Sequence, residues 1–161
     1  MGGLLVNGKE LSRSEVDKIL SAYIKAIPCV KIDVAGSYRR GKQLGFKDVD
    51  IVIIPNAITR QFIHSNFKVL KYGDKQINAE IGGIQFDFYF TNETSWGACL
   101  LRRTGSAGYS IGYAVKCKNN GWTFNDNGIF DSSGQQLAGN TEESIYALFG
   151  KEWKEPKLRG L

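Results

Sequence analysis

The spacing of hydrophobic positions changes from helical to strand-like after the first 28 residues of this 161-residue chain. Residues 16–27 place apolar side chains at helical intervals, and Ser12 with Glu15 forms a capping box in front of them. We therefore predict a first helix that Pro28 ends. A short surface helix is expected at 61–66. Strands are predicted at 30–35, 50–54, 68–72, 76–81 and 82–90.

The second part of the chain returns to helical spacing. We predict helices at 96–103, capped by Thr94 or Ser95, and at 107–118, with a last helix that starts after Thr141 and ends at Gly150. Between them, the segments 122–124 and 128–131 are predicted to pair as a hairpin across an Asn-Gly turn. The order of elements indicates an α+β fold with a mixed sheet and helices in residues 1–92, followed by a smaller α/β unit in residues 93–161.

Three aspartates stand out against this pattern. Asp48 and Asp50 are separated by one residue at the head of an apolar strand, so their side chains leave the same face. Asp87 interrupts an aromatic strand, where an ionised carboxylate is costly without a partner. Any one of them alone fits a solvated strand end. Together they favour a shared cation, and oxygen-only ligands favour Mg²⁺.

The segment 36–41, Gly-Ser-Tyr-Arg-Arg-Gly, lies close to the aspartates in the sequence. Its glycines leave backbone N–H groups accessible, and it adds a hydroxyl and two guanidinium groups. These are the groups that bind phosphates. The sequence therefore predicts a flexible phosphate-binding turn beside a metal site.

Composition narrows the class of protein. The net charge of +5 suits a polyanionic partner. Cys29, Cys99 and Cys117 are odd in number and widely spaced, which favours reduced, buried thiols and an intracellular location over a disulfide framework or a zinc site. His64 is the single histidine, so histidine-based catalysis is not expected. No apolar run is long enough to span a membrane, and the stretch at 4–6 is too short for a secretory signal.

The chain resembles the family X DNA polymerases, which fill short gaps during DNA repair. The resemblance rests on the Gly-Ser motif at 36–41 with the Asp-x-Asp strand, on 100–106, which ends in Thr-Gly-Ser, and on the tail from 142 to Arg159. It implies a nucleotidyltransferase palm at 1–92 and a thumb at 93–161. It further implies a DNA-directed DNA polymerase that adds deoxynucleotides to a primer 3′-hydroxyl by two-metal chemistry.

The resemblance also implies roles for single residues. Asp48 and Asp50 are expected to hold both of two Mg²⁺ ions, which Mn²⁺ can replace, and Asp87 only the ion that activates the primer. Contacts with the nucleotide are expected from Gly36, Ser37, Arg40, Arg102, Arg103, Gly105 and Ser110. Contacts with DNA are expected from Arg39 and from the basic residues Lys116 and Lys118. The implied partners are primer–template or gapped DNA and deoxynucleoside triphosphates, bound by a monomer without a membrane.

The chain departs from the family in ways that affect specificity. Arg102 and Arg103 stand where the family has an aromatic pair against the incoming sugar, and Ser110 and Ala114 replace base- and template-contacting residues. Weaker exclusion of ribonucleotides and lower fidelity are expected. Nothing resembles the family's lyase domain, as in a minimal viral form of the family. The alternative is a template-independent nucleotidyltransferase that acts on nucleic-acid ends or another acceptor.

Overall fold

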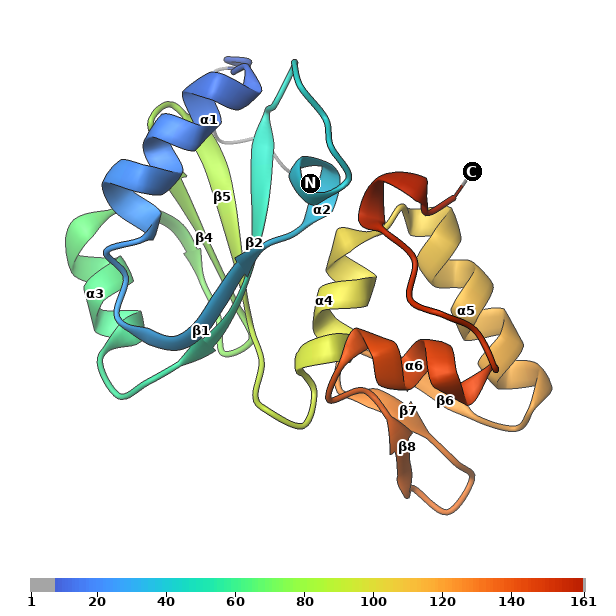
Figure 1. The fold of residues 1–161 in the computed structure, drawn as a ribbon. Helices are drawn as coiled ribbons and strands as arrows, with labels where there is room; N and C mark the ends of the chain where they lie inside the picture. The colour runs from blue at the N-terminus through green and yellow to red at the C-terminus, as the bar shows by residue number, and fades with distance from the viewer. Residues whose placement is uncertain (1–7, 161) are drawn as a thin grey trace.

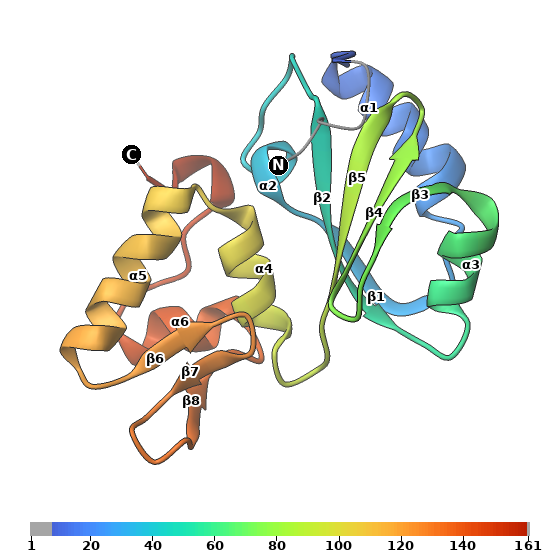
Figure 2. The same ribbon diagram turned by 180° about the vertical axis from the view of Figure 1, so that it is seen from behind.

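The computed structural model describes residues 8–160, so the apolar stretch 4–6 considered for a secretory signal lies outside the described residues. The chain forms two lobes joined by a connection at residues 91–95 (Figure 1). One lobe is built on a five-stranded sheet and the other on a three-stranded sheet with helices. The view from behind shows the same division (Figure 2). No helix in the described range is long and apolar enough to cross a membrane.

The larger sheet is mixed, with the strand order β1-β2-β5-β4-β3. Its strands are β1 (Cys29–Val34), β2 (Asp48–Pro55), β3 (Lys68–Tyr72), β4 (Gln76–Ile81) and β5 (Ile84–Phe90). β2 and β5 run parallel, whereas the other neighbours are antiparallel. The helices of this lobe are α1 (Arg13–Ile19), its continuation η1 (Leu20–Ile24), α2 (Gly36–Arg39) and α3 (Thr59–Asn66).

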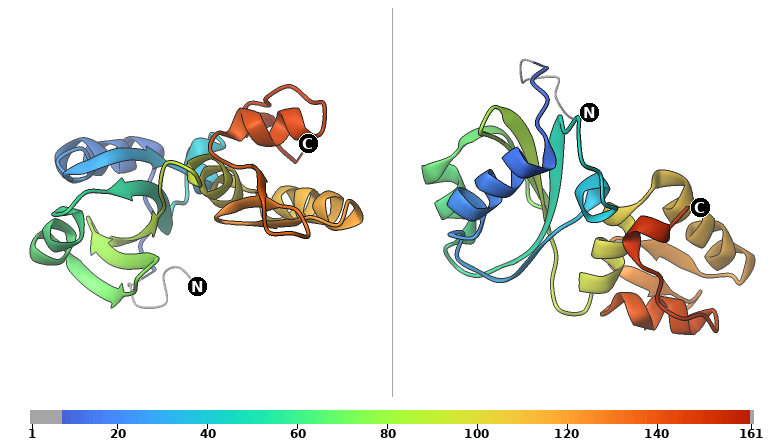
Figure 3. Two further views of the ribbon diagram at one scale, coloured as in Figure 1. Left: turned by 90° about the horizontal axis from the view of Figure 1, so that it is seen from below. Right: turned by 45° about the horizontal axis from the view of Figure 1, so that its top comes forward.

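The smaller lobe begins with two helices, α4 (Trp96–Thr104) and α5 (Ala107–Asn119). The antiparallel sheet β6 (Thr123–Asn125), β7 (Gly128–Phe130) and β8 (Gln136–Ala138) follows, then α6 (Glu142–Leu148) and the short 3₁₀ helix η2 (Pro156–Leu158). Seen from below, α4 lies between the larger sheet and the rest of this lobe (Figure 3). α4 is therefore one of the elements through which the lobes contact each other.

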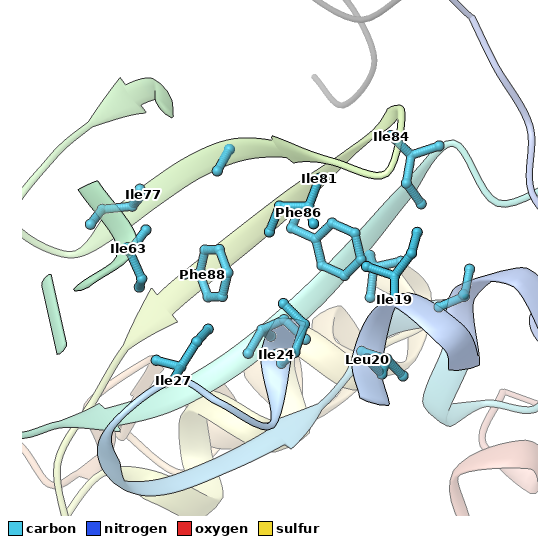
Figure 4. Packing of buried hydrophobic residues seen from close by; sticks show 14 of the residues in the cluster. Ile19, Leu20, Ile24, Ile27, Ile63, Ile77, Ile81, Ile84, Phe86 and Phe88 are labelled. Carbon is cyan, nitrogen blue, oxygen red and sulfur yellow. The ribbon is translucent and has the colours of Figure 1, made fainter. Parts of the chain in front are cut away.

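The two faces of β2 and β5 have different roles. One face points toward α1 and η1, where Phe86 and Phe88 pack among Ile19, Ile24 and other buried aliphatic residues (Figure 4). On the opposite face, Val52 and its neighbours pack against Trp96 and other residues of α4. Period-two alternation thus places the odd-numbered positions Asp87 and Tyr89 of β5 on the second face. The mixed α+β fold expected from the sequence is confirmed.

Several local expectations need correction. The segment 36–41 is not a flexible turn, because Gly36–Arg39 forms a short helix. The first helix becomes a π-helix over Leu20–Ile24 before Pro28. Ser95 precedes α4 without capping it through its side chain, and its hydroxyl donates to the carbonyl of Asn127 instead. All three cysteines are free thiols, but Cys29 is only partly buried.

Candidate active site

The three aspartates meet on the second face of the sheet. In the parallel pairing of β2 with β5, Asp50 is opposite Asp87, and Asp48 is opposite Gln85. Residues paired in this way share a face, so all three carboxylates leave the sheet on the same side. The sequence predicted that Asp48 and Asp50 share one face of a strand. The parallel register of β2 and β5 places Asp87 beside them. This arrangement concentrates negative charge at one point of the cleft between the lobes.

Asp87 is held by two amide side chains that the sequence analysis did not single out. Its Oδ1 accepts hydrogen bonds from Nδ2 of Asn78 at 2.5 Å and from Nε2 of Gln85 at 2.8 Å. Asn78 lies opposite Asp87 on β4, and Gln85 lies two residues before it on β5. Gln85 could have been found from the sequence, because it lies two residues before Asp87 on the same strand. Asn78 could not, because its position next to Asp87 depends on how β4 pairs with β5. These donors compensate the burial of Asp87, which is only 6% exposed.

The clustered acids disfavour full ionisation. Burial, followed by the charges of Asp87 and Asp48, raises the pKa of Asp50 to about 7, although Arg103 and Arg40 oppose this shift. Burial and the charge of Asp87 also raise the pKa of Asp48. The two arginines therefore do not fully offset the negative charge of the site. A divalent cation would supply the missing positive charge.

The Gly-Ser helix α2 lies directly against this carboxylate cluster. Gly36 has a φ of +60°, and a Cβ at this position would lie only 2.2 Å from Asp50 Oδ2, far inside van der Waals contact distance. Only glycine combines this backbone conformation with so close an approach. The structure thus brings the backbone of the predicted phosphate-binding segment, with Ser37 next to it, to the edge of the acid cluster.

Arg39 at the end of α2 and Arg40 directly after it both point toward the smaller lobe. Arg40 Nη1 donates to the carbonyl of Thr104 at 2.6 Å, at the end of α4. Arg39 donates to Thr104 Oγ1 at 3.0 Å and, through both terminal nitrogens, to the carboxylate of Glu142 at 2.8 and 2.9 Å. The predicted contact of Arg39 with DNA would require breaking this ion pair. The predicted contact of Arg40 with phosphate would likewise require it to leave Thr104.

Glu142 is the centre of a network that links three segments. Besides Arg39, it accepts two hydrogen bonds from Arg159, at 2.9 and 3.1 Å, and one from Trp153 Nε1 at 3.0 Å. Burial disfavours the charge of Glu142, but the arginines outweigh it and hold its pKa at about 2. The network fastens α2 to α6 and to the segment after α6. The sequence analysis gave Glu142 no role.

Arg102 and Arg103, which the resemblance assigned to nucleotide contacts, both bind one acid of the smaller lobe. Arg102 Nη1 binds Asp126 Oδ1 at 2.7 Å, and Arg103 Nη2 binds the other oxygen of the same carboxylate. The Arg103 guanidinium also lies 4.2 Å from the centre of the Tyr89 ring. Both arginines line a cavity of about 630 Å³ between the end of β5 and the β6–β7 turn. If Arg102 and Arg103 contact a nucleotide, they would do so from this cavity.

The remaining candidates lie at the start and along the length of α5. The Gly105–Ser106 peptide bond before α5 is cis. Ser110 is partly buried, and its hydroxyl donates to the carbonyl of Arg102 at 3.3 Å. Lys116 and Lys118 are exposed near the other end of the helix. Both lysines lie on the smaller lobe, whereas the acid cluster lies on the larger sheet.

The acid cluster fits a divalent cation in its chemistry but not as a finished coordination sphere. Three carboxylates on one face of adjacent strands, next to accessible backbone, form the oxygen donor set that Mg²⁺ prefers. Within residues 8–160, however, no group of three or more His, Cys, Asp or Glu side chains is arranged so that it could hold a metal ion as the side chains stand. Binding would require the side chains to rearrange, including Asp87, where a cation would compete with Asn78 and Gln85.

The mixed α+β fold in two lobes is consistent with a palm-and-thumb architecture. Residues 99–160 match the family described as DNA polymerase beta thumb, which supports a relationship to the polymerase beta group and to DNA binding. The match begins inside α4 and extends to the segment after η2. No curated protein matches the chain. The acid cluster lies outside the matched range.

Proposed function

We propose that this protein is a DNA-directed DNA polymerase that extends a primer 3′-hydroxyl and fills short gaps in DNA repair. The observation that carries the proposal is the parallel register of β2 and β5, which places Asp50 opposite Asp87 beside α2. A segment similar to a polymerase thumb follows the acids in the chain. A cluster of acids next to a phosphate-binding backbone, facing a DNA-binding lobe, fits nucleotidyl transfer better than simple DNA binding.

Each part of the site has a separate task in this proposal. Asp48 and Asp50 would hold two Mg²⁺ ions and Asp87 one of them, and the bound ions would supply Lewis-acid activation of the 3′-hydroxyl and of the triphosphate. The backbone at Gly36 and the hydroxyl of Ser37 bind the terminal phosphates. Asn78 and Gln85 orient Asp87 by hydrogen bonding to Oδ1. Asp87 accepts the proton of the 3′-hydroxyl or orients the group that does.

Primer extension with purified protein tests the proposal directly. A gapped duplex with all four deoxynucleotides and Mg²⁺ should yield a filled gap, and Mn²⁺ should substitute. Asp87→Asn should reduce extension at least about a thousandfold, because it removes a charge at the reacting centre. Asp74→Asn, at an exposed turn of the same lobe, is the matched control and should extend normally. Normal extension by Asp87→Asn would overturn the assignment.

Metal binding can be measured without turnover. Calorimetric titration of Mn²⁺ into the wild-type protein should show binding that Asp50→Asn weakens strongly. Asp87→Asn should affect only part of the signal, because Asp87 is proposed to hold one ion of the pair. Binding that is unchanged in both variants would place the metal elsewhere and would refute the proposed ligand set.

The choice of nucleotide and template is the finer part of the proposal. Arg102 and Arg103 are paired with Asp126, so no aromatic wall from these positions faces the sugar. We expect ribonucleotides to be incorporated readily for this reason. We also expect mismatched nucleotides to be incorporated more often, because Ser110 and Ala114 stand where base- and template-contacting residues are expected. High selectivity in both respects would refute this expectation. Equal extension with and without a template would instead favour a template-independent nucleotidyltransferase.

A further inference from the structure

The start of α1 is fastened to the segment that follows α2. Leu11 and Phe46 exchange two backbone hydrogen bonds of 2.9 Å, and the N–H of Arg13 donates to the carbonyl of Gln43 at 2.7 Å. α1 and the smaller lobe lie on opposite sides of α2 (Figures 1 and 2). The Gly-Ser helix therefore has a structured neighbour on each side, and the contacts with α1 are made entirely within the larger lobe.

The side chain of Arg13 contacts the Gly-Ser helix itself. Its Nη1 donates to the carbonyl of Tyr38, within α2, at 2.8 Å, and to the carbonyl of Lys42 at 3.0 Å. The guanidinium carbon lies over the Tyr38 ring, 3.8 Å from its centre, so a cation–π contact accompanies the hydrogen bonds. One side chain of α1 thus holds both ends of the turn from Tyr38 to Lys42.

A second residue of α1 holds the far end of the Tyr38 side chain. The Tyr38 hydroxyl donates to Asp17 Oδ1 at 2.5 Å, and Asp17 lies one helical turn after Arg13, on the same side of α1. The Tyr38 ring also packs against the fully buried Phe46, with the ring centres 6.1 Å apart. Tyr38 is therefore held at its carbonyl, at its ring and at its hydroxyl.

The position of Tyr38 fixes the residues of α2 that lie beside the acid cluster. Gly36, two residues earlier, lies against Asp50, and Ser37 stands between Gly36 and Tyr38. The backbone N–H of Lys42 donates to the carbonyl of Ser37 at 3.0 Å. The loop that α1 holds therefore also fixes the backbone of the proposed phosphate-binding residues.

The two restraints on α2 differ in what substrate binding requires of them. If Arg40 contacts phosphate as predicted, its hydrogen bond to the carbonyl of Thr104 is broken, and the smaller lobe releases α2 at this point. The contacts of Arg13 and Tyr38 can remain, because both lie within the larger lobe. α1 is therefore the support that stays in place when the nucleotide binds.

We infer that Arg13 is a positioning residue for nucleotide binding: it acts through Tyr38 and holds Gly36 and Ser37 where they meet the terminal phosphates. This inference rests on the proposed function and adds to it a residue of α1 that touches neither the nucleotide nor the metal. Without Arg13, α2 can adopt other arrangements, and the apparent affinity for a triphosphate falls with the fraction of molecules in the binding-competent one. The aspartates of β2 and β5 keep their places in the sheet, so the chemical step should change little.

Steady-state extension of a gapped duplex tests this inference. Arg13→Gln removes the cation and its donation to two carbonyls, so it should raise the KM for the deoxynucleotide about tenfold while kcat falls less than about threefold. Arg13→Lys keeps the charge and a donor and should recover part of the affinity, with KM raised only about threefold. Tyr38→Phe removes only the hydroxyl bonded to Asp17 and should also raise KM about threefold.

A control on the same helix separates positioning from charge and from stability. Lys18→Gln removes one positive charge from the exposed surface of α1 and should change KM by less than about twofold. A merely structural role of Arg13 would lower the melting temperature of Arg13→Gln but leave the KM of the folded enzyme unchanged. That result, or equal effects of Arg13→Gln and Lys18→Gln on KM, would overturn the inference. If Arg13→Gln does not fold, Tyr38→Phe decides, and an unchanged KM in this variant would overturn the inference.

Two measurements without turnover distinguish a failure of this inference from a failure of the proposed polymerase activity. In calorimetric titration with dATP and Mg²⁺, Arg13→Gln should bind about tenfold more weakly than the wild type. Amide hydrogen exchange should become faster at residues 36–46 of this variant and stay unchanged in α3. If the wild type extends primers but neither measurement changes in the variant, the inference fails alone. If both change but the wild type extends no primer, the proposed polymerase activity fails and the positioning role of Arg13 stands.

Discussion

Replacing Glu142 by glutamine should be among the most damaging isosteric changes in this protein. One buried carboxylate accepts five N–H groups from Arg39, Arg159 and Trp153. A glutamine offers one acceptor oxygen and turns an NH₂ group toward guanidinium donors. Arg159, whose side chain is fully buried, would keep its charge without a partner. The change therefore leaves buried charge uncompensated while the shape of the side chain is conserved.

Two arguments give the size of the effect. The pKa of Glu142 falls from an ordinary 4.5 to about 2, and a difference of this size corresponds to about 3 kcal/mol of folding free energy. Removing one partner of a buried ion pair costs about 3–5 kcal/mol in proteins where it was measured. For a domain of this length, a loss of about 3 kcal/mol lowers the melting temperature by roughly 6–12 °C.

The pH dependence follows from the sign of the shift. The folded-state pKa lies below the unfolded value, so the stabilisation by Glu142 is fully present above about pH 4.5 and is lost as the pH falls through about 2. Urea unfolding followed by circular dichroism should show a large difference between the wild type and Glu142→Gln at pH 7. The difference should shrink steadily below pH 4.5.

The neighbouring Glu143 provides a matched control, because it is exposed on the same helix. Glu143→Gln should change the stability by less than about 0.5 kcal/mol, as surface substitutions usually do. A loss below about 1 kcal/mol in Glu142→Gln, or a loss equal at pH 7 and pH 3, would show that the network contributes little. The reasoning from buried charge would then be wrong.

Three further predictions concern the acid cluster and its surroundings. Mg²⁺ at millimolar concentration should raise the melting temperature of the wild type at pH 8, and Asp50→Asn should abolish this rise; an equal rise in both would place the ion elsewhere. Gly36→Ala should lower stability and extension together, since the new Cβ meets Asp50 Oδ2, whereas Gly112→Ala, in open space on a helix, should stabilise by about 1 kcal/mol. Asp126→Asn should leave Arg102 and Arg103 without the acid that they share, and it should therefore change the KM for the nucleotide more than kcat. If neither KM nor kcat changes, the cavity lined by these arginines takes no part in nucleotide binding.

Features that depend on local periodicity could be predicted from the sequence. The alternation in β2 placed Asp48 and Asp50 on one face, and the isolated charge of Asp87 in an aromatic strand indicated that it needed a partner. The capping side chains of Ser12 and Thr141 were also recognised, because a cap depends on residues three positions apart. In each case the determining neighbours are close in the sequence or related by a simple repeat.

Features that depend on distant pairing could not be predicted in the same way. Arg39 and Glu142 are 103 residues apart, and nothing near either residue indicates the other. Asn78 approaches Asp87 only because β4 pairs with β5 in one register. The strand β8 is three residues long, which is too short to show alternation. Arg102 and Arg103 were assigned to the nucleotide by position alone, whereas the turn after β6 supplies Asp126 as their partner.

Alternate residues of β5 have two different structural roles. Phe86 and Phe88 fill the interior, and Asp87 between them faces the cleft. A deletion or insertion of a single codon between Ile84 and Phe90 would exchange these roles at once, because it would turn the carboxylate into the apolar core and the rings toward the acid cluster. We therefore expect related sequences to vary in length around Gly82 or within 91–95, but not inside β5. Inside β5, only substitutions that keep the number of residues should be tolerated.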